Sequence, residues 1–90
     1  MRIDLFLKTS RLCPRRAVAQ QLCDAGFVLI NGRPAKPSHV VKPNDEISIR
    51  RGDHEMILQV TNVPIKRQVS RGEAHEMYRI VRELDLDPGR

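Results

Sequence analysis

The chain has 90 residues, a formal net charge of +5 and a sequence pI near 9.9. A chain of this length holds one domain with one modest core, which leaves no room for a catalytic domain beside a binding module. The longest apolar run, 27–30, is far short of the roughly 20 residues that span a bilayer, and Arg2 and Asp4 interrupt the start, so we expect neither a membrane span nor a signal peptide.

Two short helices are expected first. Residues 4–10 form one, and residues 14–25 form the other, with Pro14 as its first helical residue and Gly26 as its stop. Arg15 and Arg16 then fall in the first turn of the second helix. A cation there is unfavourable by roughly 0.3–1 kcal/mol, because the exposed N–H groups already carry partial positive charge. The arrangement predicts that an anion such as a phosphate binds at this helix end.

The pattern then changes from helices to strands. Residues 27–30 are rich in strand-forming side chains and run into Asn31-Gly32, a strong hairpin signal. Alternating patterns further along predict more strands separated by turns. In chain order the expected segments are residues 40–41, a turn at 42–45, a strand at 46–50, a turn at 51–53, a strand at 56–60 and a loop at 64–69.

A third helix is expected over residues 71–84. Ser70 and Glu73 have the spacing of a capping box at its start. Apolar residues follow at helical spacing. They are Ala74, Met77, Tyr78, Val81 and Leu84. The tail, residues 85–90, is expected to be frayed.

Charge is distributed unevenly along the chain. Residues 1–51 hold ten Lys and Arg side chains against four acidic ones, whereas residues 52–90 hold six against seven. A basic N-terminal half favours a polyanionic partner docking there.

No pattern in the sequence predicts catalysis, a metal site or a cofactor. Cys13 and Cys23 are isolated cysteines without a CxxC or CxxH neighbour, so neither zinc nor a disulfide framework is expected, and a reducing cytoplasm is the natural compartment. The three histidines are scattered, and Asp45-Glu46 lies in an expected turn, where a structural role is favoured. The glycines stand singly, so there is no phosphate-binding glycine loop.

The aromatic residues limit how a nucleic acid would be bound. Phe6, Phe27 and Tyr78 are the only three, and each is expected in the core. Readers of single-stranded RNA usually stack bases on several exposed rings. We therefore expect recognition of backbone and shape. If five to seven phosphates are engaged, log K falls against log[salt] with a slope of roughly −4 to −6.

An ordered set of short motifs resembles the S-four RNA-binding domain, named for the fourth small-subunit ribosomal protein. The motifs are Arg2-Ile3-Asp4-Leu5-Phe6-Leu7, Ser10-Arg11, Arg15-Arg16-Ala17, Gly26-Phe27-Val28, Asn31-Gly32, Lys36-Pro37-Ser38 and Val41-Lys42-Pro43-Asn44-Asp45-Glu46-Ile47. Asn44 departs from the family's usual glycine, but Asn tolerates the positive φ of a tight turn.

The resemblance implies an α+β fold, in which two short N-terminal helices pack on a small antiparallel sheet, as in an alpha-L-like motif, and a C-terminal helix follows. Residues 1–51 would form the S-four-type domain, and residues 52–90 would add a strand and that helix to the same single domain. By position in the family, the RNA-binding residues would be Arg2, Lys8, Arg11, Arg15 and Arg16 on the helices, and Asn31, Arg33 and Lys36 on the neighbouring hairpin.

The whole chain resembles the stand-alone ribosome-associated quality-control members of this family, the RqcP-like group, and residues 73–78 resemble their final helix. This implies an RNA-binding factor, monomeric off the ribosome, on large subunits obstructed by peptidyl-tRNA, contacting rRNA and tRNA and supporting the alanine-tailing partner RqcH. The alternatives are a heat-shock ribosome-recycling S-four protein, an adaptor whose third helix recruits a protein, and a minimal RNA-modifying enzyme.

Overall fold

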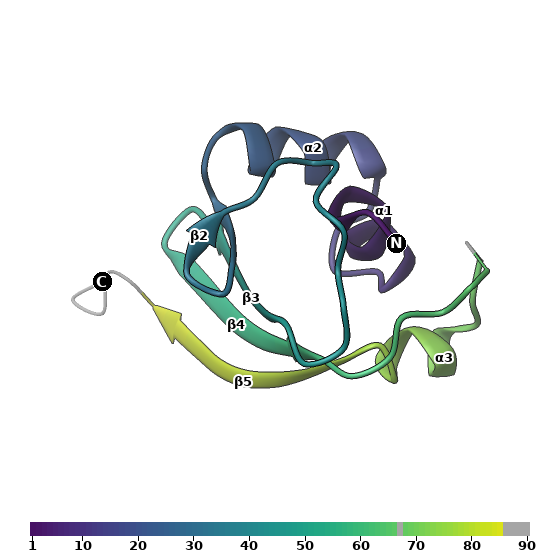
Figure 1. Cartoon of the computed structure of the whole chain (residues 1–90). Coiled ribbons are helices and arrows are strands. Elements are labelled where there is room, and N and C mark those ends of the chain that lie inside the picture. Colours follow the sequence, from purple (N-terminus) through teal and green to yellow (C-terminus); the bar gives the residue numbers. More distant parts are fainter. Residues whose placement is uncertain (67, 86–90) are drawn as a thin grey trace.

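The computed structural model describes residues 1–66 and 68–85, which form three helices and one antiparallel sheet, with the third helix next to the start of the last strand (Figure 1). In chain order the elements are α1 (Ile3–Thr9), α2 (Arg16–Asp24), β1 (Val28–Ile30), β2 (Arg33–Pro34), β3 (Glu46–Arg51), β4 (His54–Val60), α3 (Arg71–His75) and β5 (Tyr78–Asp85). The strand order across the sheet is β2-β1-β3-β4-β5, and every neighbouring pair is antiparallel. The predicted α+β fold is confirmed.

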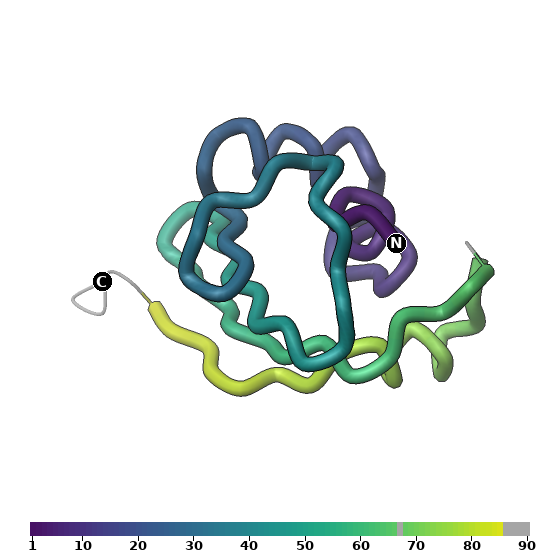
Figure 2. The backbone as a smooth tube through the Cα atoms, in the orientation of Figure 1, coloured from purple at the N-terminus to yellow at the C-terminus, as the bar shows by residue number. Residues whose placement is uncertain are grey.

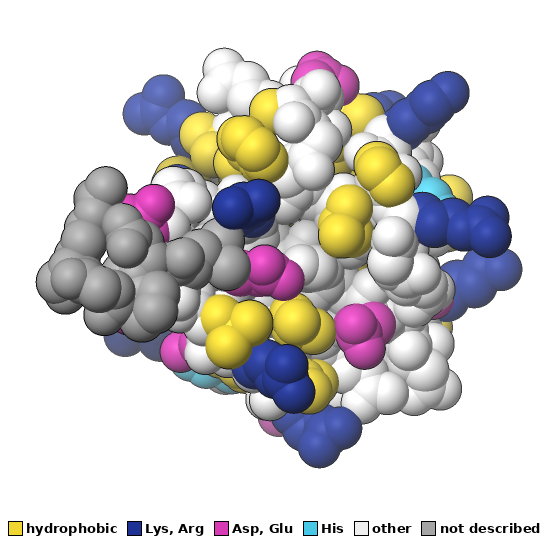
Figure 3. All heavy atoms as spheres, turned by 90° about the vertical axis from the view of Figure 1, so that its left-hand side faces the viewer, with side chains coloured by type: hydrophobic (Ala, Val, Ile, Leu, Met, Phe, Trp, Pro, Cys, Tyr) yellow, Lys and Arg dark blue, Asp and Glu magenta, His cyan; other side chains and the backbone are white. Residues whose placement is uncertain are grey.

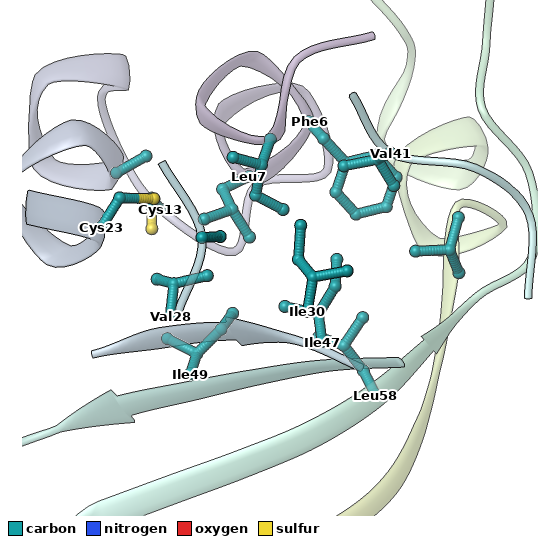
Figure 4. Packing of buried hydrophobic residues seen from close by; sticks show 14 of the residues in the cluster. Phe6, Leu7, Cys13, Cys23, Val28, Ile30, Val41, Ile47, Ile49 and Leu58 are labelled. Atoms are coloured by element: carbon teal, nitrogen blue, oxygen red, sulfur yellow. The ribbon is translucent and has the colours of Figure 1, made fainter. Parts of the chain in front are cut away.

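The core lies between the sheet and the first two helices (Figure 4). Ile47 and Ile49 of β3 alternate with exposed or half-buried residues, so their side chains face α1 and α2. Phe6 and Leu7 of α1 are fully buried against them. Phe27 was expected here, but that prediction is wrong: Val28 takes the inward position of the strand, and Phe27 is 44% exposed.

The connection between β2 and β3 holds the start of α1 in place. It runs past the N-terminus of the chain (Figure 2), where Ile3 N–H donates to His39 O at 2.7 Å and Asp4 N–H donates to Pro37 O at 3.3 Å. Val41 N–H donates to Met1 O at 2.9 Å on the other side. These carbonyls satisfy N–H groups that a helix start otherwise leaves without partners.

Two asparagines adopt the left-handed conformation in turns. Asn31 has φ 51° and Asn44 has φ 75°, so the expected positive φ at Asn44 is confirmed. The side chain of Asn31 joins its turn to β3: it accepts from Glu46 N–H at 2.9 Å and donates to Asp45 Oδ1 at 3.1 Å. Asp45 also accepts from Lys42 N–H at 2.9 Å. Asp45 therefore has the structural role that its place in a turn predicted.

The helix predicted over 71–84 is wrong in its extent. The Ser70–Glu73 capping box is present, but α3 ends at His75 and Tyr78 begins the strand β5. The first residues of β5, Tyr-Arg-Ile-Val-Arg, include β-branched and aromatic side chains that favour strands, and the edge of β4 pairs with all of them except Val81, where the register shifts by one residue. The apolar residues at helical spacing are therefore divided among α3, the turn at 76–77 and β5. Of the expected frayed tail, Asp85 ends β5 and residues 86–90 lie outside the described residues.

Candidate nucleic-acid interface

Three arginines lie at the N-termini of the first two helices. Arg2 is the N-cap of α1, Arg15 is the N-cap of α2, and Arg16 is the first residue of α2. The prediction that Pro14 begins this helix is therefore wrong: Arg15 is still extended, with φ −141° and ψ 149°, and helical geometry starts only after it. Neither N-cap side chain makes a capping hydrogen bond.

Asp4 brings two of these arginines together. Its Oδ2 atom lies 3.1 Å from a terminal nitrogen of Arg2 and 3.2 Å from Nε of Arg16. Gln20 of α2 donates to the same oxygen at 3.0 Å, and Leu5 N–H donates to Oδ1 at 2.8 Å. The Arg16 Nε atom is buried and makes an ion pair with Asp4, without the alignment of a hydrogen bond. A carboxylate from α1 thus fixes two guanidinium groups that come from different elements.

Asp4 remains ionised although its side chain is fully buried. Burial acts to raise the pKa of Asp4, but the contacts from Gln20, Arg16 and Leu5 N–H outweigh it and hold this pKa below its usual value. The anion predicted at the start of α2 is therefore supplied in part from within the chain. The sequence analysis did not predict this role. A signal was present, because Asp4 lies between Ile3 and Phe6 on the buried side of α1.

Arg15 is the arginine of this group that stays free to bind a ligand. It is exposed, and it makes no ion pair within the described part of the chain. We call Arg2, Arg15 and Arg16 the arginine face. Its three positive charges are opposed by the single carboxylate of Asp4, so a net positive charge remains where two helix N-termini meet.

Lys8 and Arg11 lie at the other end of α1, about 10 Å along a helix of this length. Lys8 is in the last turn, where a cation suits the helix dipole. Arg11 follows the helix with φ 66°; its N–H donates to Lys8 O at 3.0 Å, and its guanidinium reaches Val69 O at 3.4 Å. The five helix cations predicted from the sequence therefore form two groups at opposite ends of α1.

The three hairpin residues that were predicted to bind RNA are not all close to the arginine face. Lys36 is exposed and directly precedes Pro37, whose carbonyl accepts from Asp4 N–H, so Lys36 lies near the start of α1. Arg33 is exposed on β2, the outer strand of the sheet. Asn31 is occupied by its bonds to Asp45 and Glu46. Of these three residues, Lys36 is the one placed beside the helix cations.

The side of the molecule away from the start of α1 has a different character. Figure 3 shows it with hydrophobic, basic and acidic side chains interspersed. Across residues 1–66 and 68–85 no group of three or more His, Cys, Asp and Glu side chains could hold a metal ion. In the same residues no helix is long and apolar enough to cross a membrane.

Cys13, before α2, and Cys23, on the buried side of α2, lie side by side in the core (Figure 4). Burial, together with the nearby charges of Asp4, Asp24 and Cys13, raises the pKa of Cys23 from 9.0 to about 11. The folded chain keeps this thiol protonated, whereas the unfolded chain releases its proton from about pH 9. We therefore expect the free energy of unfolding to fall as the pH rises from 9 towards 11.

Urea unfolding at several pH values in this range checks this. The fall should be smaller for Cys23→Ala than for the unmodified chain, with each variant compared with its own stability at pH 8. Equal falls in the two proteins would show that Cys23 does not titrate in this way.

Comparison with known proteins places the chain in a family. Residues 1–47 match the family model described as S4 domain. The RQC P-site tRNA stabilizing factor of Bacillus subtilis is 43% identical over 96% of this chain and 98% of its own length. Heat shock protein 15 of Escherichia coli is 31% identical over 87% of this chain but only 58% of its own length. The trimeric structure of Vibrio cholerae heat shock protein 15 superposes with a TM-score of 0.81 at 30% identity, over 90% of this chain and 81% of that one. The chain therefore belongs to the S4-domain family, within which it matches RQC P-site tRNA stabilizing factors over nearly their whole length.

Proposed function

We propose that the chain is a non-catalytic RNA-binding factor that docks its arginine face on the rRNA and tRNA of large ribosomal subunits obstructed by peptidyl-tRNA. There it supports the rescue of stalled nascent chains in the cytoplasm, as a monomer off the ribosome, with the alanine-tailing factor RqcH as its protein partner. The observation that carries the proposal is the convergence of Arg2, Arg15 and Arg16 at the N-termini of α1 and α2, where Asp4 holds Arg2 and Arg16 and no side chain caps the start of α2.

The arginine face suits phosphate groups better than bases. No side chain caps the start of α2, and helix N-termini bind anions through free N–H groups and the helix dipole. Guanidinium groups bind phosphate through two parallel hydrogen bonds. The exposed ring of Phe27 directly precedes β1 and lines a surface recess with Ser48 and Arg50 of β3, away from the helices. Structured RNA, recognised by backbone and shape, is therefore the ligand that this surface favours.

Sequence identity favours quality control over heat-shock recycling. The chain is 43% identical to the Bacillus subtilis factor but 31% identical to the Escherichia coli heat shock protein. The adaptor alternative depended on a helix over 71–84, and that surface is divided between α3 and β5. A partner such as RqcH would then contact exposed residues of β5, among them Val81, and not a helix face.

Co-sedimentation with large subunits that carry peptidyl-tRNA tests the proposal. We expect the unmodified chain to bind these subunits, and we expect Arg15→Glu to weaken binding about tenfold, because a phosphate contact is replaced by repulsion. The thermal midpoint should stay the same, since Arg15 makes no ion pair in the described chain. Arg50→Glu is the matched control: it makes the same charge change at an exposed position of β3 on the other side of the sheet.

Salt dependence provides a second readout of the same interaction. Asp4 neutralises one of the five helix cations, so about four phosphates should be engaged and the slope of log K against log[salt] should be roughly −3 to −4. This is shallower than the sequence alone predicts. Arg15→Glu should reduce the magnitude of the slope by about one further phosphate. A slope near zero, or equal binding by Arg15→Glu, would contradict the proposal.

A further inference from the structure

A recess of about 370 Å³ lies at the C-terminal end of α1, at the opposite end of that helix from Arg2, and the contacts described above do not explain it. Two parts of the chain that are far apart in the sequence form its walls: the last turn of α1 with the link from α1 to α2, and the residues before α3. The lining residues are Lys8, Thr9, Arg11, Cys13, Pro14, Gln68 and Val69.

The lining specifies the kind of ligand. Lys8 and Arg11 supply two cations, and no Asp or Glu is among the lining residues, so an anionic group is favoured. Pro14 and Val69 add apolar surface, which a phosphate alone would not use. A volume of about 370 Å³ is also in the range of clefts that hold small organic molecules, and larger than a phosphate group requires.

The walls of the recess are built to stay in place. Arg11 adopts φ 66°, a conformation that non-glycine residues rarely take, and its backbone N–H is bonded to Lys8 O. From there its guanidinium reaches Val69 O and joins the helix side of the recess to the segment before α3. Cys13 N–H donates to Leu7 O at 3.0 Å and ties the link to α1. Non-glycine residues held at positive φ, as Arg11 is here, cluster at functional sites.

We propose that this recess receives one unpaired nucleotide of the bound RNA, with its phosphate on Lys8 and Arg11 and its base against Pro14 and Val69. The planar guanidinium of Arg11 offers a surface on which a base stacks, in the absence of an aromatic residue in the lining. The inference rests on the proposed function, because it assumes that RNA lies on the arginine face. It adds a preference for a bulge or a loop over an uninterrupted duplex.

The test compares two RNA hairpins that differ by a single bulged 4-thiouridine. We expect the unmodified chain to bind the bulged hairpin about tenfold more tightly than the paired one, which is the discrimination that one stacked base supplies. Gln68→Trp, which fills the recess from an exposed position, should remove this ratio and leave the affinity for the paired hairpin unchanged. Asn62→Trp is the matched control: it places the same side chain at an exposed position of the same segment that does not line the recess.

Photocrosslinking from the bulge gives an independent readout. The crosslinked peptides should contain residues 8–14 or 68–69. An equal affinity for the two hairpins, an unchanged ratio in Gln68→Trp, or crosslinks that lie only elsewhere would overturn the inference. Binding to the paired hairpin and to obstructed large subunits reports on the proposed function separately, since the loss of the ratio alone leaves both intact.

Discussion

Replacing Asp4 by alanine is expected to lower the free energy of unfolding by about 3 kcal/mol, because the substitution leaves a buried guanidinium nitrogen without its partner. Arg2 and Arg16 are 47% and 36% exposed, so water compensates part of the loss, and the low end of the range for broken buried ion pairs applies. A domain of this length has roughly 5–10 kcal/mol of stability in total. The variant should therefore melt at a markedly lower temperature.

RNA affinity should fall in the same variant even below its melting temperature. Without the carboxylate, the guanidinium groups of Arg2 and Arg16 lose the contact that orients them. Urea unfolding and RNA titration at low temperature measure the two effects. Asp24→Ala is the control, because Asp24 is an exposed acid at the C-terminal end of α2. Unchanged stability in Asp4→Ala would show that the buried ion pairs do not support the fold.

The pH dependence of stability offers a further check on Asp4. Its pKa is lower in the folded chain than the usual 3.8, so the unfolded chain takes up the proton first as the pH falls. The stabilisation is complete above about pH 4 and is lost as the pH falls through the lowered pKa. Asp4→Asn should remove this component of the acid sensitivity.

Arg16→Glu is expected to impair both folding and binding, in contrast to Arg15→Glu. A glutamate at position 16 places a second carboxylate within about 3–4 Å of the buried Asp4 carboxylate, which should lower the free energy of unfolding by about 2–3 kcal/mol. It also removes one cation from the arginine face and adds an anion, so affinity for the large subunit should fall about a hundredfold.

A conservative variant separates the two roles of Arg16. Arg16→Lys keeps the charge beside Asp4, so stability should largely be retained, while the loss of the guanidinium geometry should still weaken phosphate binding. Thermal melts and co-sedimentation on the three proteins provide the comparison. If Arg16→Glu melted at the same temperature as the unmodified chain, the ion pair with Asp4 would not stabilise the fold.

Local signals in the sequence predicted local features well. Gly26 and the Asn31-Gly32 pair lie at the expected ends of α2 and β1, and the Ser70–Glu73 capping box begins α3 as expected. Each of these signals depends on residues a few positions apart. The extent of α3 could not be predicted in this way, because Tyr78 and the following residues are drawn into a strand by β4, which lies about twenty positions earlier in the chain.

The candidate site shows the same division. The positions of Arg15 and Arg16 at a helix start were predictable, but the ion pair from Asp4 to Arg16 spans two helices and required the packed structure. The contact of Arg11 with Val69 O joins residues 58 positions apart. Sequence reasoning therefore found the charges, and the fold determines which of them are free to bind a ligand.

The carbonyls of Pro37 and His39 at the start of α1 make the arginine face a product of the whole fold. Arg2 and Asp4 are held in place by a segment that the chain reaches only after β1 and β2 have formed. A nascent chain that ends before residue 39 would contain every arginine of the face but not its geometry. The geometry of the arginine face should therefore depend on residues 37–41 as much as on the two helices that carry the arginines.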